Sequence, residues 1–348
     1  MTLTQPSTRL SDAASLRRPT VVRLGWLATG AAILVVLSVA SLAFGAREVS
    51  LDQIFAALGG DTSGVAESAI VKRIPRTVLA IIVGAALALS GATMQAVTRN
   101  PLAEPGILGI SGGASLAVVT GIAFFGLADP YLYIWIAIIG AAGAAVVVYL
   151  VGSLGRGGAT PLKLALAGAA IAATCTSLIS AILLPRVDVL TTFRFWQIGG
   201  VGGATWERIG VIAPFLVVGA LICFLCARGM NTLGLGDDLA TGLGENVMRT
   251  RVVSAIGAVI LCGAATAIAG PIGFVGLVIP HLCRLLVGTD LRWVLPFSAV
   301  LGAGLLVAAD VIGRVIARPE EIDVGITTAL IGAPFFIWIV RRQKVREL

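Results

Sequence analysis

The stretch that decides the fold is "TVLAIIVGAALALSGATMQAVTRNPLAEPGILGISGGASLAVVTGIAFFGL", residues 77–127. Two apolar runs, 77–97 and 107–127, are each long enough to cross a bilayer as a helix. Between them, Asn100 precedes a proline and therefore disfavours helical backbone, while Glu104 and Pro105 suit the first turn of a new helix. The pattern predicts two membrane helices joined by a tight polar corner.

The composition extends this interpretation to the whole chain. Of 348 residues, 57% are hydrophobic and only 12% are charged, and the mean hydropathy is +1.00. Soluble domains carry about 25% charged residues, so a soluble fold is excluded. The 43 glycines suit close helix packing in lipid, and the alternating segments and aromatic girdles of a β-barrel are missing. We predict an all-α, polytopic membrane protein.

Ten apolar segments have the length of membrane spans or nearly so. They are residues 26–44, 77–97, 107–127, 131–150, 163–184, 209–225, 252–269, 272–287, 294–312 and 324–340. We expect residues 1–22 to form a disordered cytoplasmic segment and residues 23–348 to form one transmembrane domain. With both termini inside, the inner segments hold most of the lysines and arginines, as the positive-inside rule requires.

A faint internal echo relates two of the predicted spans. "GAALALSG" (residues 84–91) and "GAATAIAG" (residues 263–270) match at five of eight positions, and the predicted topology makes them cross in opposite directions. This is the arrangement of an inverted repeat, which many transporters use. Chance recurrence of Gly/Ala octamers is the alternative.

Residues for catalysis or for a cofactor are missing from the sequence. The chain has no G-x-x-x-x-G-K-[ST] motif, so it does not bind ATP in the P-loop manner. His281 is the only histidine and the five cysteines lie in or beside apolar runs, which favours packing over a metal site. We expect no enzyme activity, no cofactor and no nucleic-acid partner. The net charge of +7 would suggest nucleic acid in a soluble protein, but in a membrane protein its distribution between the two sides matters more.

Two polar regions indicate protein partners. The loop 227–251 carries apolar residues at helical spacing among charges, which predicts short helices that bury against another protein; a solvated connector is the alternative. At the opposite side, Arg73, Arg76 and Arg314 are basic where the positive-inside rule disfavours them. They could anchor to lipid phosphates or receive the acidic residues of a docking protein. Asp310 lies one helical turn from Arg314 and is expected to pair with it; a proton relay at Asp310 is the alternative.

Four segments together resemble the FecCD-type permeases of bacterial ABC importers, which move ferric siderophores, haem and cobalamin. The resemblance is nearly full length from the second predicted span onward. It rests on "RIPRTVLAIIVGAALALSGATMQAVTRNPLAEPGILGISGGASL", "LGLGDDLATGLG", "GPIGFVGLVIPHLCRLLVGTDLRWVLPFSAVLGAGLLVAADVIGR" and "DVGITTALIGAPFFIWIV". It implies a ten-helix subunit that pairs with a second permease, identical or paralogous, and that works with two cytoplasmic ATPases and an extracytoplasmic binding protein.

The resemblance also implies roles for particular residues. Loop 227–251 would couple to the ATPase, and the basic side chains would dock the binding protein. The predicted docking residues are Arg73, Arg76 and Arg314, the coupling residues are Asp238, Ala240, Gly242 and Gly244, and the pathway or gate residues are Thr160, Thr174, Ser177, Gly112 and Gly113. For Thr174 and Ser177, hydrogen bonding to their own helix is the alternative. The glycines would let residues 107–127 pack near the dimer axis.

The predicted function is that of an importer permease for a ferric siderophore in the bacterial inner membrane. A haem or cobalamin permease of the same family is the alternative. An ion-coupled secondary transporter is an alternative from a different class, and a structural membrane scaffold is a third. The sequence itself does not distinguish the chelates, because this family's motifs are shared among them.

Overall fold

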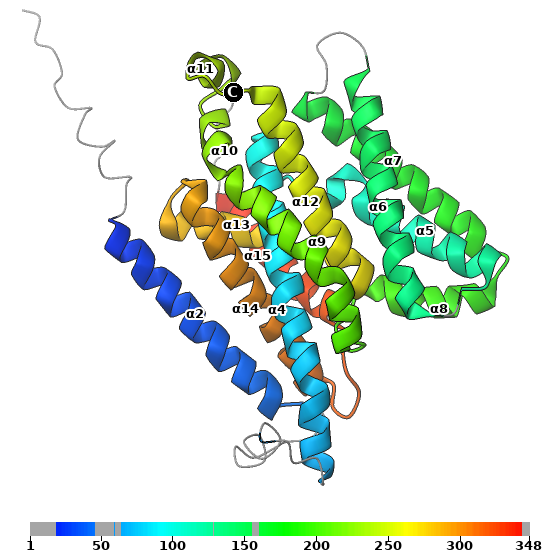
Figure 1. Ribbon diagram of the computed structural model, residues 1–348. Coiled ribbons are helices and arrows are strands. Elements are labelled where there is room, and N and C mark those ends of the chain that lie inside the picture. The colour runs from blue at the N-terminus through cyan, green and yellow to red at the C-terminus, as the bar shows by residue number, and fades with distance from the viewer. Residues whose placement is uncertain (1–18, 46–58, 60–63, 128, 155–159, 343–348) are drawn as a thin grey trace, which may run out of the picture.

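The computed structural model describes residues 19–45, 59, 64–127, 129–154 and 160–342, and its regular structure there is helical throughout (Figure 1). The helices are α2 (Thr20–Ala43), α4 (Val65–Thr98), the 3-10 turn η1 (Pro105–Leu108), α5 (Ile110–Phe125), α6 (Pro130–Ser153), α7 (Pro161–Leu183), α8 (Val187–Ile198), α9 (Trp206–Leu225), α10 (Ala227–Leu233), α11 (Asp237–Gly242), α12 (Val247–Ala269), α13 (Val275–Val287), α14 (Leu291–Ile316) and α15 (Val324–Arg342). The all-α prediction is confirmed for these residues.

Seven of the described helices are long and apolar enough to cross a bilayer. They are α2, α4 from Ile70, α6 from Tyr131, α7 from Leu162, α9, α12 and α14, while α5, α13 and the segment Val324–Trp338 of α15 are apolar but shorter. Each of the ten predicted spans overlaps one of these ten helices. A multi-pass membrane protein is therefore established, and ten complete crossings stay a prediction.

Helix α4 forms the centre of the bundle. It packs against α14, α12, α13 and α9, and 78% of its most apolar window is buried, against 11% for α2. Small residues allow this: a Cβ at Gly84 would overlap the backbone of Gly302, and one at Gly91 would overlap that of Gly276. Glycine at these positions lets α14 and α13 approach the α4 backbone directly.

Helices α5 to α8 form a group at one side of the bundle (Figure 1). Within it α5 packs on α6 and α7, and α12 packs against α6 to join the group to the rest. Figure 1 also shows α4 and α12 running in opposite directions. The two similar octamers, residues 84–91 and 263–270, were predicted to cross the membrane in opposite directions, and the directions of α4 and α12 agree with this. The inverted repeat itself stays a prediction.

Two helices begin earlier than predicted. Helix α4 begins at Val65, twelve residues before the predicted start, so Arg73 and Arg76 lie within the helix and not before it. Helix α2 begins at Thr20, so the predicted boundary after residue 22 falls inside a helix; residues 1–18 lie outside the described residues. Hydropathy missed both because each helix starts with charged or polar residues.

Helix α8 was not predicted at all. It buries Val189 and Phe193 and packs Trp196 against the core, at the spacing i, i+4, i+7 of an amphipathic helix. A search for runs long enough to cross a membrane passes over such a short helix, although its periodicity was available in the sequence.

Candidate functional site

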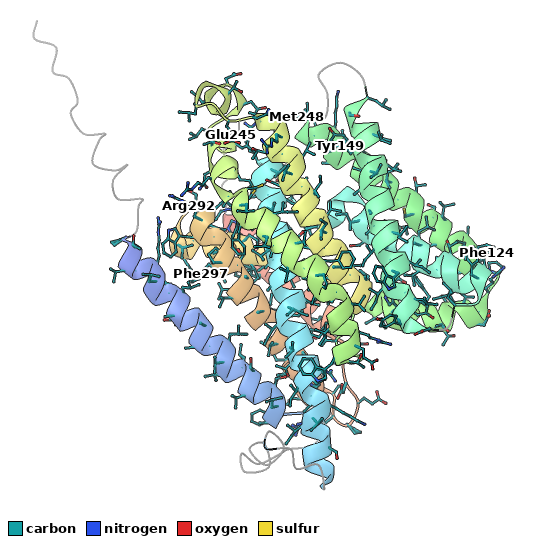
Figure 2. The ribbon with its side chains drawn as sticks, in the orientation of Figure 1. Phe124, Tyr149, Glu245, Met248, Arg292 and Phe297 are labelled. Carbon is teal, nitrogen blue, oxygen red and sulfur yellow. The ribbon has the colours of Figure 1, made fainter. Side chains whose placement is uncertain are left out.

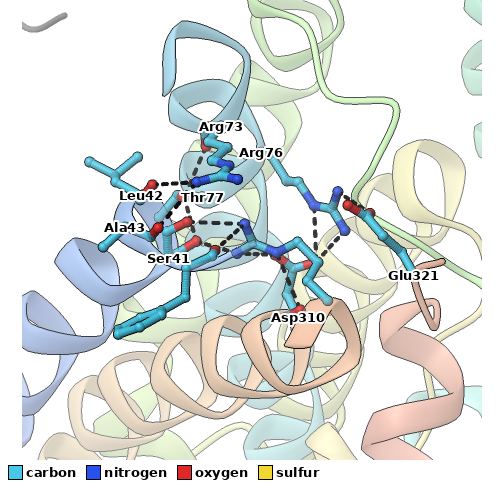
Figure 3. Close-up of polar contacts among 10 residues, drawn as sticks. Ser41, Leu42, Ala43, Arg73, Arg76, Thr77, Asp310 and Glu321 are labelled. Carbon is cyan, nitrogen blue, oxygen red and sulfur yellow. Dashed lines mark hydrogen bonds and ion pairs between the residues drawn. The ribbon is translucent and has the colours of Figure 1, made fainter. Parts of the chain in front are cut away.

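A buried charge network lies at the end of the bundle where α2 finishes and α4 starts. Asp310 of α14 holds two guanidinium groups: Arg76 donates from Nε and Nη2 to Oδ1 at 3.0 and 2.8 Å, and Arg314 Nη2 lies 2.9 Å from Oδ2. Arg76 also reaches Glu321 Oε2 at 2.6 Å (Figure 3). We call these four residues the Asp310 network. The predicted pairing of Asp310 with Arg314 is confirmed.

The Asp310 network also fixes the end of α2. Arg314 Nη1 donates to the carbonyls of Ser41 and Phe44 at 3.0 and 3.1 Å, and its Nη2 donates to Ser41 Oγ at 2.7 Å. Arg73 Nη1 donates to the Leu42 carbonyl at 2.8 Å. Because the last carbonyls of a helix lack intrahelical partners, these arginines act as its C-terminal cap.

The structure corrects the place expected for Arg314. Its side chain is 1% exposed and its donors are used within the chain, so a docking protein cannot reach it in this arrangement. Arg76 is 14% exposed and its outer partner Glu321 is 39% exposed. The accessible part of the Asp310 network is therefore Arg76 with Glu321, with partly buried Arg73 beside it.

The predicted coupling loop forms two short helices, α10 and α11, at the opposite end of the bundle (Figure 1). Asp238 is exposed, and Leu239 and Leu243 are 63% and 66% exposed. Ala240 is fully buried beneath them, so this predicted coupling residue supports the helix from inside and does not present itself to a partner. The short helices are confirmed, and the exposed leucines give the element an apolar outer face.

Of the two predicted coupling glycines, one is required by the backbone. Gly244 has φ +84, a left-handed conformation that L side chains rarely adopt, while Gly242 ends α11 with open space where a Cβ would stand. A substitution at Gly244 is therefore strained, and one at Gly242 is tolerated by the chain itself.

Asp237 was missed as a site residue. Its Oδ1 accepts from Arg99 Nη2 and from Arg251 Nη2, the latter at 2.8 Å. It thereby joins the start of α11 to the end of α4 and to α12. The acidic pair Asp237–Asp238 was visible in the sequence, but which member turns inward depends on the position of Arg99, 138 residues away.

The predicted pathway residues on α7 hydrogen-bond to their own helix. Thr174 Oγ1 donates to Ala170 O at 2.9 Å and Ser177 Oγ to Ala173 O at 3.0 Å, and both residues are exposed. Each hydroxyl thus has its hydrogen-bond acceptor within α7, and both side chains stay on the exposed face of that helix. Thr160 is the N-cap of α7 and accepts from Lys163 N at 3.4 Å. The five residues directly before it, 155–159, lie outside the described residues.

The predicted glycine pair of α5 faces neighbours within the same chain. A Cβ at Gly113 would overlap Ala144 and lie 2.5 Å from the Gly140 carbonyl in α6, and one at Gly112 would lie 3.3 Å from Cys175 Cβ in α7. The glycines permit close helix packing as expected. The partners are α6 and α7, so this face is occupied before any second subunit arrives.

The polar corner "NPLAEPG" is tied to a distant loop. Helix α4 ends at Thr98 with Arg99 left-handed at φ 51, and Asn100 Oδ1 accepts from Leu102 N at 2.9 Å. Glu104 stands at the N-cap position of η1, but its side chain makes no cap there. Its Oε1 accepts from Phe274 N at 3.2 Å instead. Burial raises the pKa of the Glu104 carboxyl, and the Phe274 hydrogen bond opposes part of that rise.

Metal-ligating side chains do not cluster in the described part of the chain. No group of three or more His, Cys, Asp or Glu residues is placed there to hold a metal ion, and the five cysteines are free thiols. The described residues instead form charge networks, capped helix ends and an exposed apolar face on α11. These features suit the binding of protein partners.

Comparison with known proteins gives the family. Residues 33–342 match the FecCD transport family. The chain belongs to the FecCD transport family. It is 44% identical over 321 residues to a probable siderophore transport system permease protein of Bacillus subtilis, covering 91% of this chain and 96% of that one. It is 43% identical to the ferric enterobactin transport system permease protein of Escherichia coli, covering 89% and 93%.

A solved structure of a metal-chelate type ABC transporter in an inward-facing conformation has the same fold. Its TM-score is 0.80 at 30% identity, and the match covers 92% of this chain and 99% of that one. The predicted family is thus confirmed, and this FecCD protein is a transport permease and not an enzyme. The chain is also 41% identical to a hemin transport system permease protein of Yersinia pestis, covering 78% of this chain and 82% of that one.

Proposed function

We propose that this FecCD permease translocates a ferric siderophore as the membrane subunit of an ATP-driven importer. Four of the similar proteins are named as permeases for a siderophore, a hydroxamate, enterobactin or citrate, at 43–48% identity. The observation that carries the assignment is the match over residues 33–342 together with 44% identity to a siderophore permease over nearly its whole length. Haem is the second candidate, supported by the 41% identical hemin permease.

The proposed assembly has two permease subunits, each crossing the membrane ten times with both termini in the cytoplasm. The α10–α11 element then lies on the cytoplasmic side, where its exposed leucines would seat in an ATPase subunit. The Asp310 network lies at the outer mouth. Energy comes from ATP bound by the partner, because this chain has no P-loop.

The accessible edge of the Asp310 network is the proposed docking site for the binding protein. Glu321 binds Arg76 at 2.6 Å from the exposed side, and a carboxylate of a docking protein would take the same guanidinium face. Arg314 and Asp310 hold Arg76 from beneath. This assigns docking to Arg73 and Arg76 and positioning to Arg314.

Uptake by the complete importer in proteoliposomes tests the transport function. We expect radioactive iron to accumulate from a ferric siderophore when ATP is enclosed with the ATPases, with a protonophore having no effect. The permease alone should accumulate none. Accumulation driven by a proton gradient without ATP would show an ion-coupled carrier instead, and uptake of haem but not of any siderophore would select the second candidate.

The docking site is tested with the variant Arg73→Glu/Arg76→Glu. Reversing charges that meet acidic partners should reduce binding of the binding protein at least about tenfold, because removing a desolvated charge pair costs about 2–5 kcal/mol. Lys72→Glu, an exposed neighbour on the same helix, is the matched control. Equal binding by the double variant and the control, as a purely structural scaffold would give, contradicts this docking site.

A further inference from the structure

A cavity of about 1070 Å³ lies at the α11 end of the bundle. It is enclosed by the start of α2, the end of α4, α10, the end of α13 and the start of α14. Figure 2 shows Arg292 at this position, close to the start of α2. Among its lining side chains are four arginines, Arg23, Arg99, Arg284 and Arg292, but only one acid, Asp290.

Two of these arginines are already neutralised. Arg99 pairs with Asp237, and Arg292 pairs with Asp290 at 2.7 Å. In the described part of the chain, Arg23 and Arg284 have no carboxylate within ion-pair distance. Two positive charges, contributed by α2 and α13, therefore line the cavity without compensation.

The surroundings of Arg23 and Arg284 leave room for an acceptor. Arg284 Nη1 donates to the neutral amide oxygen of Gln95 at 2.6 Å, so its charge is oriented but not cancelled. Arg23 Nε is buried without a hydrogen-bond partner. A buried donor left unpaired is costly. Since Arg23 lines the cavity and its Nε is closed to water as the side chain stands, a small shift of the side chain would be needed to bring Nε to an anion there.

A tryptophan beside the cavity and the exposure of α2 indicate that the cavity lies at a membrane interface. Arg23 is in the first turn of α2 and stacks over the Trp293 ring, with its Cζ 5.7 Å from the ring centroid. Tryptophan is enriched where the hydrocarbon meets the headgroups. Helix α2 is only 11% buried over its apolar window and packs mainly on α14. Its outer face is therefore open to lipid, and a lipid can reach the cavity from the bilayer.

We propose that this cavity binds the phosphodiester headgroup of an anionic phospholipid, held by Arg23 and Arg284. Planar guanidinium groups match phosphate oxygens in pairs of hydrogen bonds, and basic pockets between membrane helices accept anionic headgroups. The bound lipid links α2 to α13, which otherwise touch little.

Lipid titration of the purified, delipidated importer with its ATPases tests the site. We expect phosphatidylglycerol to bind, as counted by native mass spectrometry, and to raise the unfolding temperature by several degrees, as preferential binding to the folded state requires. Phosphatidylcholine should do neither. Compared with wild type, the variant Arg23→Gln/Arg284→Gln should bind about one lipid fewer per permease and show little of the temperature shift, because both uncompensated charges are removed.

Arg249→Gln is the matched control, since Arg249 is exposed at the same end and does not line the cavity. Only variants that elute as folded, assembled importer are compared, and Arg23→Lys/Arg284→Lys, which keeps both charges, should retain part of the binding. Equal lipid binding by the Gln double variant and the control overturns the proposal. Two further results also overturn it. One is that inorganic phosphate alone gives the full temperature shift. The other is that the lipid binds only when the ATPases are absent, because the cavity would then be a site for an acidic surface of the ATPase in the assembled importer.

Discussion

Glu104 and Phe274, 170 positions apart in the sequence, are joined by a hydrogen bond of 3.2 Å from the Phe274 backbone N–H to Glu104 Oε1. Phe274 is left-handed at φ 68, one of two non-glycine residues with positive φ in the described part of the chain. The carboxylate thus holds the strained residue that starts α13, and it fastens the polar corner after α4 to the loop after α12. The hydrogen bond therefore joins the motif "NPLAEPG" (residues 100–106) to the motif "GPIGFVGLVIPH" (residues 270–281).

The first prediction concerns removal of this carboxylate. Glu104→Ala should lower the free energy of unfolding by about 1–3 kcal/mol, because a partly buried N–H loses its acceptor. Glu104→Gln keeps an oxygen at the same position and should lose less. Chemical unfolding in detergent measures both variants. Equal losses would mean that the Phe274 bond contributes nothing.

The same pair predicts a pH dependence. Burial raises the folded-state pKa of Glu104 above its ordinary value of 4.5, so the folded state binds the proton more tightly than the unfolded state. Stability therefore increases as the pH falls from above the folded pKa toward 4.5 and decreases as the pH rises through that window. Glu104→Gln cannot titrate, so the stability of wild type relative to this variant should decline with rising pH. A pH-independent difference would contradict the assigned shift.

The second prediction concerns Asp310. Asp310→Asn should destabilise the protein by about 3–5 kcal/mol, because it leaves Arg76 and Arg314 together without their shared buried carboxylate. Glu321→Gln removes the exposed partner of Arg76 and should cost at most about 1 kcal/mol. The unfolding midpoints of the two variants compare the buried ion pair of Arg76 with Asp310 and its exposed ion pair with Glu321. Similar midpoints would show that the Asp310 network is not the anchor of α2, α4 and α14.

The third prediction concerns the close contact of α4 with α13. A Cβ at Gly91 would overlap the Gly276 backbone, so Gly91→Ala should force the helices apart and cost about 1–3 kcal/mol. Gly143→Ala is the control, because α6 leaves open space at that position. Thermal unfolding should separate the variants. A Gly91→Ala protein as stable as the control would mean that the helices separate freely.

The sequence predicted the elements that carry a strong local signal. Apolar runs predicted all ten apolar helices, and charges among leucines predicted α10 and α11. What it missed depends on distant neighbours: the exposure of Arg314 depends on where α2 ends, and the direction of Ala240 depends on what lies under α11. Local spacing could pair Asp310 with Arg314, but it could not show that Arg76, 234 positions away, takes the other oxygen.

The fourth prediction concerns the exposed face of α11. Leu239→Ser/Leu243→Ser should leave folding unchanged, because both side chains are mostly exposed, and should reduce ATPase binding at least about tenfold, because burying each leucine contributes about 1.5–3 kcal/mol. Leu184→Ser, another exposed leucine outside α10 and α11, is the matched control. Co-purification of the ATPase with each variant gives the binding, and uptake in proteoliposomes gives the transport. Full ATPase binding by the double variant would place the partner elsewhere on the permease, and intact binding with lost uptake would assign these leucines to the transmission of movement and not to assembly.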